Sequence, residues 1–168
     1  LSRGPLTDRN GVLLAAAKNG SYRYADDPVL RRASLHAVGD YRGRIASAAL
    51  STFARRLTGY SAATGTTAPE GETVTLALDG ELQKTAWTAL LGRAGAVLVM
   101  NYETGEILCL VSSPNYDPYT EPDESVEGIY LNRAFNASFT PGSVFKPAVA
   151  IAALEEKTVT PETAVTCT

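Results

Sequence analysis

The sequence has 168 residues, 45% of them hydrophobic and 20% charged, with a formal net charge of −3. This composition excludes a disordered chain and suffices for one domain or two small ones. No apolar stretch approaches the ~18 residues that a membrane span needs, and a single histidine excludes a histidine-rich metal site. The chain begins with leucine and shows no signal peptide, so we expect an excised fragment whose native ends are missing.

The charges are distributed unevenly along the chain. Residues 1–60 hold ten Lys/Arg and four Asp/Glu, whereas residues 61–168 hold five Lys/Arg and fourteen Asp/Glu. The basic part has two interpretations: a surface for an anionic membrane or cell-wall polymer, or a solvated face without a partner. No nucleic-acid-binding motif accompanies the charge, which argues against a nucleic-acid partner.

The first residues predict a small antiparallel sheet. Two apolar runs, 5–7 and 12–15, flank Asp8-Arg9-Asn10-Gly11. The Asn-Gly pair favours the positive φ angles of a tight hairpin turn. Residues 22–24 alternate in polarity and extend the same sheet, and Asp26-Asp27-Pro28 then predicts the start of a helical or irregular stretch.

A helix and a linker are predicted next. Apolar residues at four-residue intervals predict an amphipathic helix over residues 45–57. Residues 58–71, rich in Gly, Ser, Thr, Ala and Pro, predict a loop or linker. We therefore expect one region over residues 1–72 and a second over residues 73–168.

The second region opens with a strand over residues 73–78. Asp79 then caps a helix that runs to Leu91 and stops at Gly92. The residues expected to face inward on this helix are Leu82, Ala86, Ala89 and Leu90.

An antiparallel hairpin follows, with strands at 96–100 and 106–112 joined by a turn at 102–105. Both strands barely alternate in polarity, so we expect both faces of the hairpin to be covered. Residues 113–128 carry three prolines and many acidic residues and predict an exposed loop.

The cysteines and the histidine are expected to have no catalytic or metal-binding role. Cys109 is expected in the core, and neither Cys109 nor Cys167 has the spacing of metal ligands. His36 is expected to be structural.

A serine and a lysine near the end of the sequence have the spacing of a catalytic pair. Ser143 and Lys146 stand three residues apart, directly before Pro147 and the apolar run 148–154. Pro147 lacks an N–H group and is tolerated only in the first turn of a helix or just before it, so a helix starts near Ser143. One face of that turn then carries both side chains, which suits a serine nucleophile with a neutral lysine as its base.

The start of a helix supports this chemistry. The N–H of Ser143 can hold a developing oxyanion, and the positive end of the helix dipole disfavours a protonated lysine. The apolar neighbours Val144, Phe145 and Val149 would favour the neutral amine of Lys146 by excluding water. The alternative is an N-capping serine with a solvated lysine, and the local residues alone leave both interpretations open.

Several segments, in the family's own order, resemble the class B penicillin-binding proteins. They are Arg3-Gly4-Pro5-Leu6-Thr7-Asp8-Arg9-Asn10-Gly11, Leu76-Ala77-Leu78-Asp79, Gly95-Ala96-Val97 through Thr104-Gly105-Glu106, Ser113-Pro114-Asn115-Tyr116-Asp117-Pro118, Asn132-Arg133-Ala134 and Pro141-Gly142-Ser143-Val144-Phe145-Lys146. Ser-x-x-K is the nucleophile motif of penicillin-binding proteins.

The resemblance implies an α+β fold. Residues 1–72 would form a small N-terminal pedestal with a β-hairpin and a helix, used for interaction or dimerisation. Residues 73–168 would form the truncated N-terminal part of a transpeptidase domain, an antiparallel hairpin with helices.

The resemblance also implies a D,D-transpeptidase of peptidoglycan biosynthesis. Ser143 would attack the D-Ala–D-Ala amide of a stem peptide, with Lys146 as general base and the Ser143 N–H on the oxyanion. β-Lactams would acylate the same serine, and no metal or organic cofactor is needed. The parent protein would lie at the extracytoplasmic face of the cell membrane, with polymerase, divisome or elongasome proteins of cell-wall assembly as its partners.

The family also carries Ser-x-Asn and Lys-Thr-Gly motifs after the nucleophile, and neither occurs between Lys146 and Thr168. We therefore expect this chain alone to be inactive and not to bind penicillin measurably. The predicted helix over residues 147–154 is apolar on nearly every side and would normally be packed against other parts of the protein. We therefore expect the chain to self-associate or to hold this helix loosely. Two alternatives are a non-catalytic interaction module within residues 1–90, and a β-lactam sensor or serine β-lactamase relative.

Overall fold

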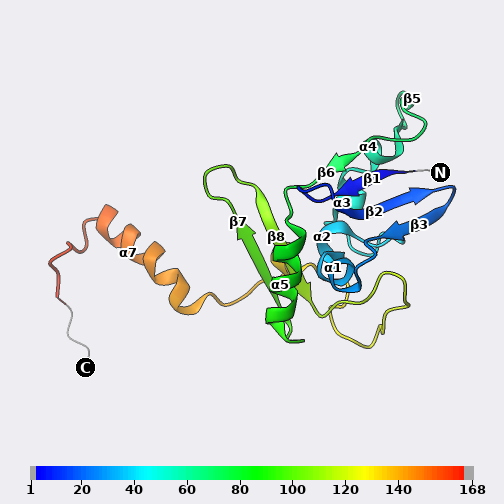
Figure 1. The fold of residues 1–168 in the computed structure, drawn as a ribbon. Helices are drawn as coiled ribbons and strands as arrows, with labels where there is room; N and C mark the ends of the chain where they lie inside the picture. The colour runs from blue at the N-terminus through cyan, green and yellow to red at the C-terminus, as the bar shows by residue number, and fades with distance from the viewer. Residues whose placement is uncertain (1–2, 165–168) are drawn as a thin grey trace. The chain divides into compact units, whose positions relative to one another are not determined.

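The computed structural model describes residues 3–164 and divides the chain into two compact units, residues 1–137 and 138–168 (Figure 1). The first unit combines helices with small antiparallel and mixed sheets, so the predicted α+β class is confirmed. Among the described residues, no helix has the length and apolar character needed to cross a membrane.

A four-stranded sheet in the order β3-β2-β1-β6 lies at the N-terminal side of the first unit. Strands β1 (Arg3–Thr7), β2 (Leu13–Lys18) and β3 (Ser21–Tyr24) form the predicted antiparallel arrangement. The strand predicted over residues 73–78 is reduced to β6 (Val74–Thr75), which pairs in parallel with β1. The predicted region boundary at residue 72 stays a prediction.

The turn between β1 and β2 is wider than the tight Asn-Gly turn that the sequence predicts. Gly11 has a positive φ of 82°, whereas Asn10 does not have one. Oδ1 of the buried Asp8 accepts the N–H of Asn10 at 2.9 Å and the N–H of Val12 at 2.8 Å. The turn prediction was wrong because this carboxylate, rather than the dipeptide alone, organises the loop.

Two short helices follow the sheet. Helix α1 (Pro28–Ala33) begins at the predicted place, where the Asp27 carboxylate accepts the N–H groups of Val29 and Leu30. Helix α2 (Leu35–Val38) continues from it and ends at Gly39.

The single helix predicted over residues 45–57 is wrong. Helices α3 (Ala49–Thr52) and α4 (Ala54–Thr58) are separate and meet at Phe53, whose φ of −99° and ψ of 16° leave the helical region. The Ser51 hydroxyl donates to the Ala46 and Ala48 carbonyls just before α3, which competes with helical hydrogen bonding in the first part of the predicted helix. The following linker also contains a short ladder, β4 (Tyr60–Ser61) with β5 (Gly65–Thr66).

Helix α5 (Gly80–Leu90) confirms the predicted helix, and Asp79 caps it by accepting the N–H groups of Glu81 and Leu82. The left-handed residue that ends the helix is Leu91, with a φ of 49°, and Gly92 also has a positive φ. Ala89 is exposed, against expectation, because the buried face is shifted to one that includes Gln83.

The predicted hairpin is present as β7 (Gly95–Met100) and β8 (Ile107–Ser113). Helix α5 packs against β8, and Cys109 is buried there as expected, while Cys167 lies outside the described residues. The expected cover on both faces is wrong for β7 in this structure, because Leu98, Val99 and Met100 are 36–53% exposed.

The exposed loop predicted over residues 113–128 is found only in part, because residues 119–121, 123–125 and 127 are exposed whereas residues 116–118 are buried. Tyr116 and Asp117 are each 6% exposed, and the Asp117 carboxylate accepts two hydrogen bonds from the Arg31 guanidinium of α1, at 2.7 and 2.9 Å. The prolines and acidic residues suggested solvent throughout, but this ion pair fixes the first part of the segment against α1. Helix α6 (Arg133–Asn136) follows, N-capped by Asn132.

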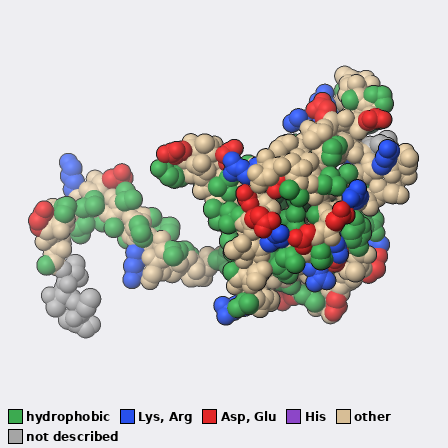
Figure 2. Space-filling view, in the orientation of Figure 1, with side chains coloured by type: hydrophobic (Ala, Val, Ile, Leu, Met, Phe, Trp, Pro, Cys, Tyr) green, Lys and Arg blue, Asp and Glu red, His purple; other side chains and the backbone are tan. Residues whose placement is uncertain are grey.

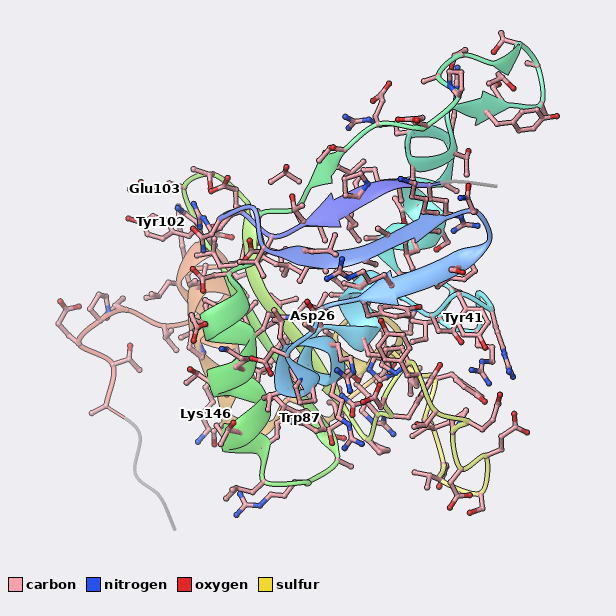
Figure 3. All side chains as sticks on the ribbon, turned by 45° about the vertical axis from the view of Figure 1, so that its right-hand side comes forward. Asp26, Tyr41, Trp87, Tyr102, Glu103 and Lys146 are labelled. Atoms are coloured by element: carbon pink, nitrogen blue, oxygen red, sulfur yellow. The ribbon has the colours of Figure 1, made fainter. Side chains whose placement is uncertain are left out.

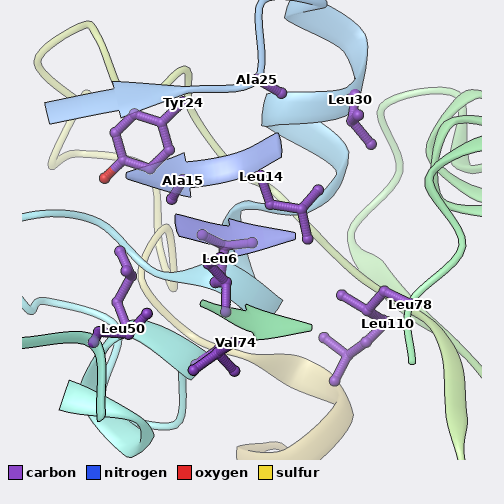
Figure 4. Packing of buried hydrophobic residues seen from close by; sticks show 13 residues of the cluster. Leu6, Leu14, Ala15, Tyr24, Ala25, Leu30, Leu50, Val74, Leu78 and Leu110 are labelled. Carbon is purple, nitrogen blue, oxygen red and sulfur yellow. The ribbon is translucent and has the colours of Figure 1, made fainter. Parts of the chain in front are cut away.

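The main core joins the sheet to the helices around it (Figure 4). Its buried members include Leu6 and Leu14 from the strands and Leu57 from α4. Val74 and Leu110, which come later in the sequence, belong to the same cluster. A second cluster joins Leu35 and Ile45 to Tyr116 and Ile129. Each of these clusters thus brings together side chains that are widely separated in sequence.

Within its described residues, the second unit contains a 3₁₀ helix η1 (Gly142–Phe145) that continues into α7 (Lys146–Glu155). Hydrophobic side chains line the surface of α7 (Figure 2). Val149, Ile151 and Leu154 are 56, 58 and 44% exposed.

Candidate active site

The structure places the predicted catalytic pair in one helical turn. Ser143 is the second residue of η1, and Lys146 is the first residue of α7. In a 3₁₀ turn, side chains three residues apart lie directly above one another. Both residues therefore lie on the same face at the start of the helix, as the spacing predicts.

Pro147 explains why the first turn is 3₁₀ and not α-helical. In an α-helix, the Ser143 carbonyl would accept a hydrogen bond from the residue at position 147, and proline has no N–H to donate. The N–H of Lys146 bonds to the Ser143 carbonyl instead. The proline thus favours the 3₁₀ hydrogen bond that joins the backbones of Ser143 and Lys146.

The approach to Ser143 requires a glycine. Gly142 has a φ of 56°, in the left-handed region that favours glycine, and a Cβ placed there would meet nothing within 4 Å. The glycine therefore serves the backbone turn and not a close contact. The amides at the start of η1 have no partner inside the helix, as is general for helix N-termini.

The side chains of the pair are open to solvent. Ser143 and Lys146 are exposed, and among residues 3–164 neither side chain takes part in a hydrogen bond or ion pair. Val144, Phe145 and Val149 are 81, 56 and 56% exposed, so the predicted exclusion of water around Lys146 is not found in this unit. The expectation fails because these side chains flank the turn without enclosing it.

The other residues considered in the sequence have structural environments. His36 is 1% exposed, and its Nε2 lies 3.1 Å from the Ile129 carbonyl oxygen. Burial raises the pKa of the Cys109 thiol to about 11, which makes it inert as a nucleophile at neutral pH. Within residues 3–164, no group of three or more His, Cys, Asp or Glu side chains is placed to hold a metal ion.

Sequence reasoning missed a buried polar cluster in the first unit. The Asp40 carboxylate accepts hydrogen bonds from Arg44 Nε at 2.6 Å and from the Tyr116 hydroxyl at 2.9 Å. The Arg44 guanidinium also lies over the Tyr116 and Tyr130 rings, at 5.4 and 4.9 Å from their centroids. The only sequence signal was the adjacency of Asp40 and Arg44, because Tyr116 and Tyr130 lie far along the chain.

Comparison with known proteins supports the resemblance that the sequence indicates. The family model "Penicillin binding protein transpeptidase domain" matches residues 95–168, which contain the Ser143 turn. The chain is 38% identical over 98 residues to the probable peptidoglycan D,D-transpeptidase PenA of Neisseria flavescens, covering 54% of this chain and 24% of that protein. It is 36% identical over 104 residues to the peptidoglycan D,D-transpeptidase MrdA of Escherichia coli, covering 55% of this chain and 16% of that protein.

A solved structure extends the similarity to nearly the whole chain. The crystal structure of Pseudomonas aeruginosa PBP2 in complex with WCK 5153 matches with a TM-score of 0.73 and 29% identity, covering 98% of this chain and 41% of that one. These comparisons support a fragment of a class B penicillin-binding transpeptidase. Residues 95–168 match part of that transpeptidase domain, and the chain spans less than a quarter of the length of the curated relatives PenA and MrdA.

Proposed function

We propose that the protein containing this chain is a peptidoglycan D,D-transpeptidase that works through a serine acyl-enzyme. The observation that carries the proposal is the position of Ser143 and Lys146 in one helical turn, inside the segment that matches the transpeptidase family. The relatives PenA and MrdA are named as peptidoglycan D,D-transpeptidases, which supports the same reaction class.

In the proposed reaction, Lys146 in its neutral form takes the proton of the Ser143 hydroxyl. The Ser143 oxygen forms a bond to the carbonyl carbon between the two D-Ala residues of a stem peptide. The Ser143 N–H stabilises the oxyanion, the amide bond breaks, and the terminal D-Ala leaves with a proton. The amine of a second stem peptide then attacks the ester, forms the cross-link and releases the serine.

The same chemistry accounts for β-lactam binding. The strained lactam carbonyl would react with Ser143 in place of the D-Ala–D-Ala amide, and the ring opening leaves the drug attached to the enzyme. Neither step requires a metal or organic cofactor.

We also propose how the chain divides between interaction and catalysis. Residues 1–72 serve as a pedestal that contacts polymerase, divisome or elongasome proteins, and residues 73–168 contribute the front of the transpeptidase domain. The parent protein is proposed to act at the extracytoplasmic face of the cell membrane, where its peptidoglycan substrate is found.

Labelling with a fluorescent penicillin tests the catalytic assignment in the full-length parent protein. We expect covalent labelling of the wild type, no labelling of Ser143→Ala, and a labelling rate reduced by about 10²–10⁴ in Lys146→Ala, as for loss of a general base. Ser138→Ala, a nearby serine change in the same unit, should label like the wild type. Undiminished labelling of Ser143→Ala would refute the assignment.

The isolated chain provides a second test. We expect the 168 residues alone to remain unlabelled, because the motifs that line the substrate site in the family do not occur after Lys146 in this sequence. Slow release of the drug from the labelled parent is expected of a transpeptidase, whereas rapid turnover would indicate a serine β-lactamase instead.

A further inference from the structure

A hollow of about 240 Å³ opens on the surface of the first unit, and none of the residues that line it takes part in the proposed reaction. Its apolar lining includes Ile45, Ala48 and Leu50, which are 1–6% exposed and belong to the folded interior. Its charged and aromatic lining includes Arg3 of β1 and Tyr41 with Arg42 of the loop after α2. Tyr41 is labelled in Figure 3 near the β3 side of the sheet.

Stacked rings hold the two arginines in place. The Tyr22 and Tyr41 rings stack with centroids 5.1 Å apart and an interplanar angle of 29°. The Arg3 guanidinium lies 5.8 Å from the Tyr22 centroid, and the Arg42 guanidinium lies 5.4 Å from the Tyr41 centroid. Arginine stacked on an aromatic ring keeps its planar donors ordered and available at the ring edge.

The charge of this hollow is positive. Within residues 3–164, Arg3 makes no ion pair. Asp40 also lines the hollow, but its carboxylate is neutralised by Arg44 at 2.6 Å. Arg42 pairs with Glu121 through both terminal nitrogens, and the Glu121 side chain is 70% exposed.

We propose that this hollow binds an extended acidic segment of a partner protein. An apolar side chain of that segment would lie on the apolar lining, and flanking carboxylates would pair with Arg3 and Arg42. Glu121 shows that a carboxylate can engage both terminal nitrogens of Arg42. The chain's own glutamate thus acts as a weak internal competitor, because exposed ion pairs contribute little to stability.

The hollow fits a peptide better than a membrane surface. Attraction to anionic lipids grows with the number of lysines and arginines on a broad face, whereas this site has two arginines beside an apolar concavity. The combination of apolar lining and flanking arginines matches a segment in which an apolar residue stands between acidic ones. The inference extends beyond the transpeptidase proposal and does not depend on Ser143.

A fluorescent peptide tests the proposal with the full 168-residue chain. The probe is a fluorescein-labelled Glu-Glu-Leu-Glu-Glu peptide, measured by anisotropy in low salt and compared with a Gln-Gln-Leu-Gln-Gln peptide. We expect saturable binding of the acidic peptide alone. Arg3→Ala and Arg42→Ala should weaken it about three- to tenfold, and added salt should weaken it further because the contacts lie near solvent.

The variant Glu121→Gln gives the sharpest result. Removing the internal competitor should tighten binding about two- to fivefold, the range expected for an exposed ion pair. Glu121 is exposed, so this change leaves the fold intact, and Arg93→Ala controls for the loss of one positive charge elsewhere on the surface. Equal binding by the wild type, Arg3→Ala and Glu121→Gln would overturn the proposal. Binding to vesicles of phosphatidylglycerol, lost in Arg3→Ala and without any peptide binding, would overturn it in favour of a membrane site.

Discussion

His36 lies in the interior between the helices and the segment that follows β8. Burial lowers the pKa of its imidazole to about 4, and the nearby positive charge of Arg133 acts in the same direction, while the Ile129 carbonyl partly offsets both. A neutral imidazole fits this site, and a proton on it would place a charge in the core.

Acid should therefore destabilise the first unit through His36. Between about pH 6.5 and pH 4 the unfolded chain binds a proton at His36 that the folded chain does not, so stability falls as the pH is lowered through that window. The loss is complete near the folded pKa and amounts to about 3 kcal/mol. Urea denaturation at several pH values between 7 and 4 measures it.

His36→Gln separates this effect from other titrations. Glutamine keeps a donor for the Ile129 carbonyl and does not titrate, so the variant should show a flat stability profile between pH 6.5 and about 4.5. Asp40 and Asp117 have pKa values lowered from 3.8 despite the opposing effect of burial, because arginine hydrogen bonds stabilise their charged forms. Their contributions are lost at lower pH, as the pH falls through their folded pKa values. An unchanged slope in His36→Gln would contradict the assignment.

At the level of single residues, the sequence predicts what local chemistry decides. The structural role of His36 and the core position of Cys109 follow from residue type and neighbours, and both are confirmed. The Asp40–Tyr116 hydrogen bond spans 76 positions, so no local pattern indicates it. Ser143 and Lys146 were found in their predicted helical turn because Pro147 restricts the helix start locally, whereas their solvent exposure depends on tertiary contacts.

Helix α5 and strand β8 are joined by one buried glutamine. Gln83 is fully buried, its Nε2 donates to the Leu110 carbonyl at 3.1 Å, and its Oε1 accepts the Leu110 N–H at 2.7 Å. The Gln83 side chain thus pairs with both the N–H and the carbonyl of Leu110, on the edge of β8 that does not pair with β7. The sequence pattern assigned inward positions to apolar residues and overlooked Gln83, because periodicity arguments count a polar side chain as exposed.

Gln83→Ala should destabilise the first unit by leaving both Leu110 groups unpaired. Each unpaired buried group costs about 1–3 kcal/mol. Thr85→Ala on the exposed side of the same helix is the matched control and should change the stability by less than about 0.5 kcal/mol. Hydrogen exchange at the Leu110 amide should accelerate in Gln83→Ala before global unfolding does. Unchanged protection of that amide would show that the glutamine is not its partner in solution.

Elements were predicted well where one signal determined them. The Asp27 and Asp79 caps located the starts of α1 and α5, and the paired apolar runs located the β7–β8 hairpin. The helix over residues 45–57 was not found as one element, because the Ser51 hydroxyl bonds to carbonyls ahead of α3 and Ile45 packs into a separate cluster. Such competition between side-chain and backbone hydrogen bonds is not visible in apolar spacing.

At the scale of the whole molecule, the two units differ in how they bury apolar surface. The first unit buries its apolar side chains in several clusters, whereas α7 in the second exposes Val149, Ile151 and Leu154. A ten-residue helix is marginal in water without packing on its apolar surface. The sequence predicts this directly, because residues 148–154 are apolar on every side of the helix.

We therefore expect the isolated chain to self-associate through α7 as its concentration rises. Exposed apolar surface of this kind favours association. Sedimentation velocity over a concentration series should show oligomers for the wild type and a shift to monomer for Ile151→Glu. The control is Val12→Glu, which should associate like the wild type. It adds the same charge at an apolar residue of the first unit, and Val12 is 45% exposed, compared with 58% for Ile151. A wild-type chain that stays monomeric at all concentrations, with α7 amides as protected from exchange as those of α5, would show that the helix is stable without a partner.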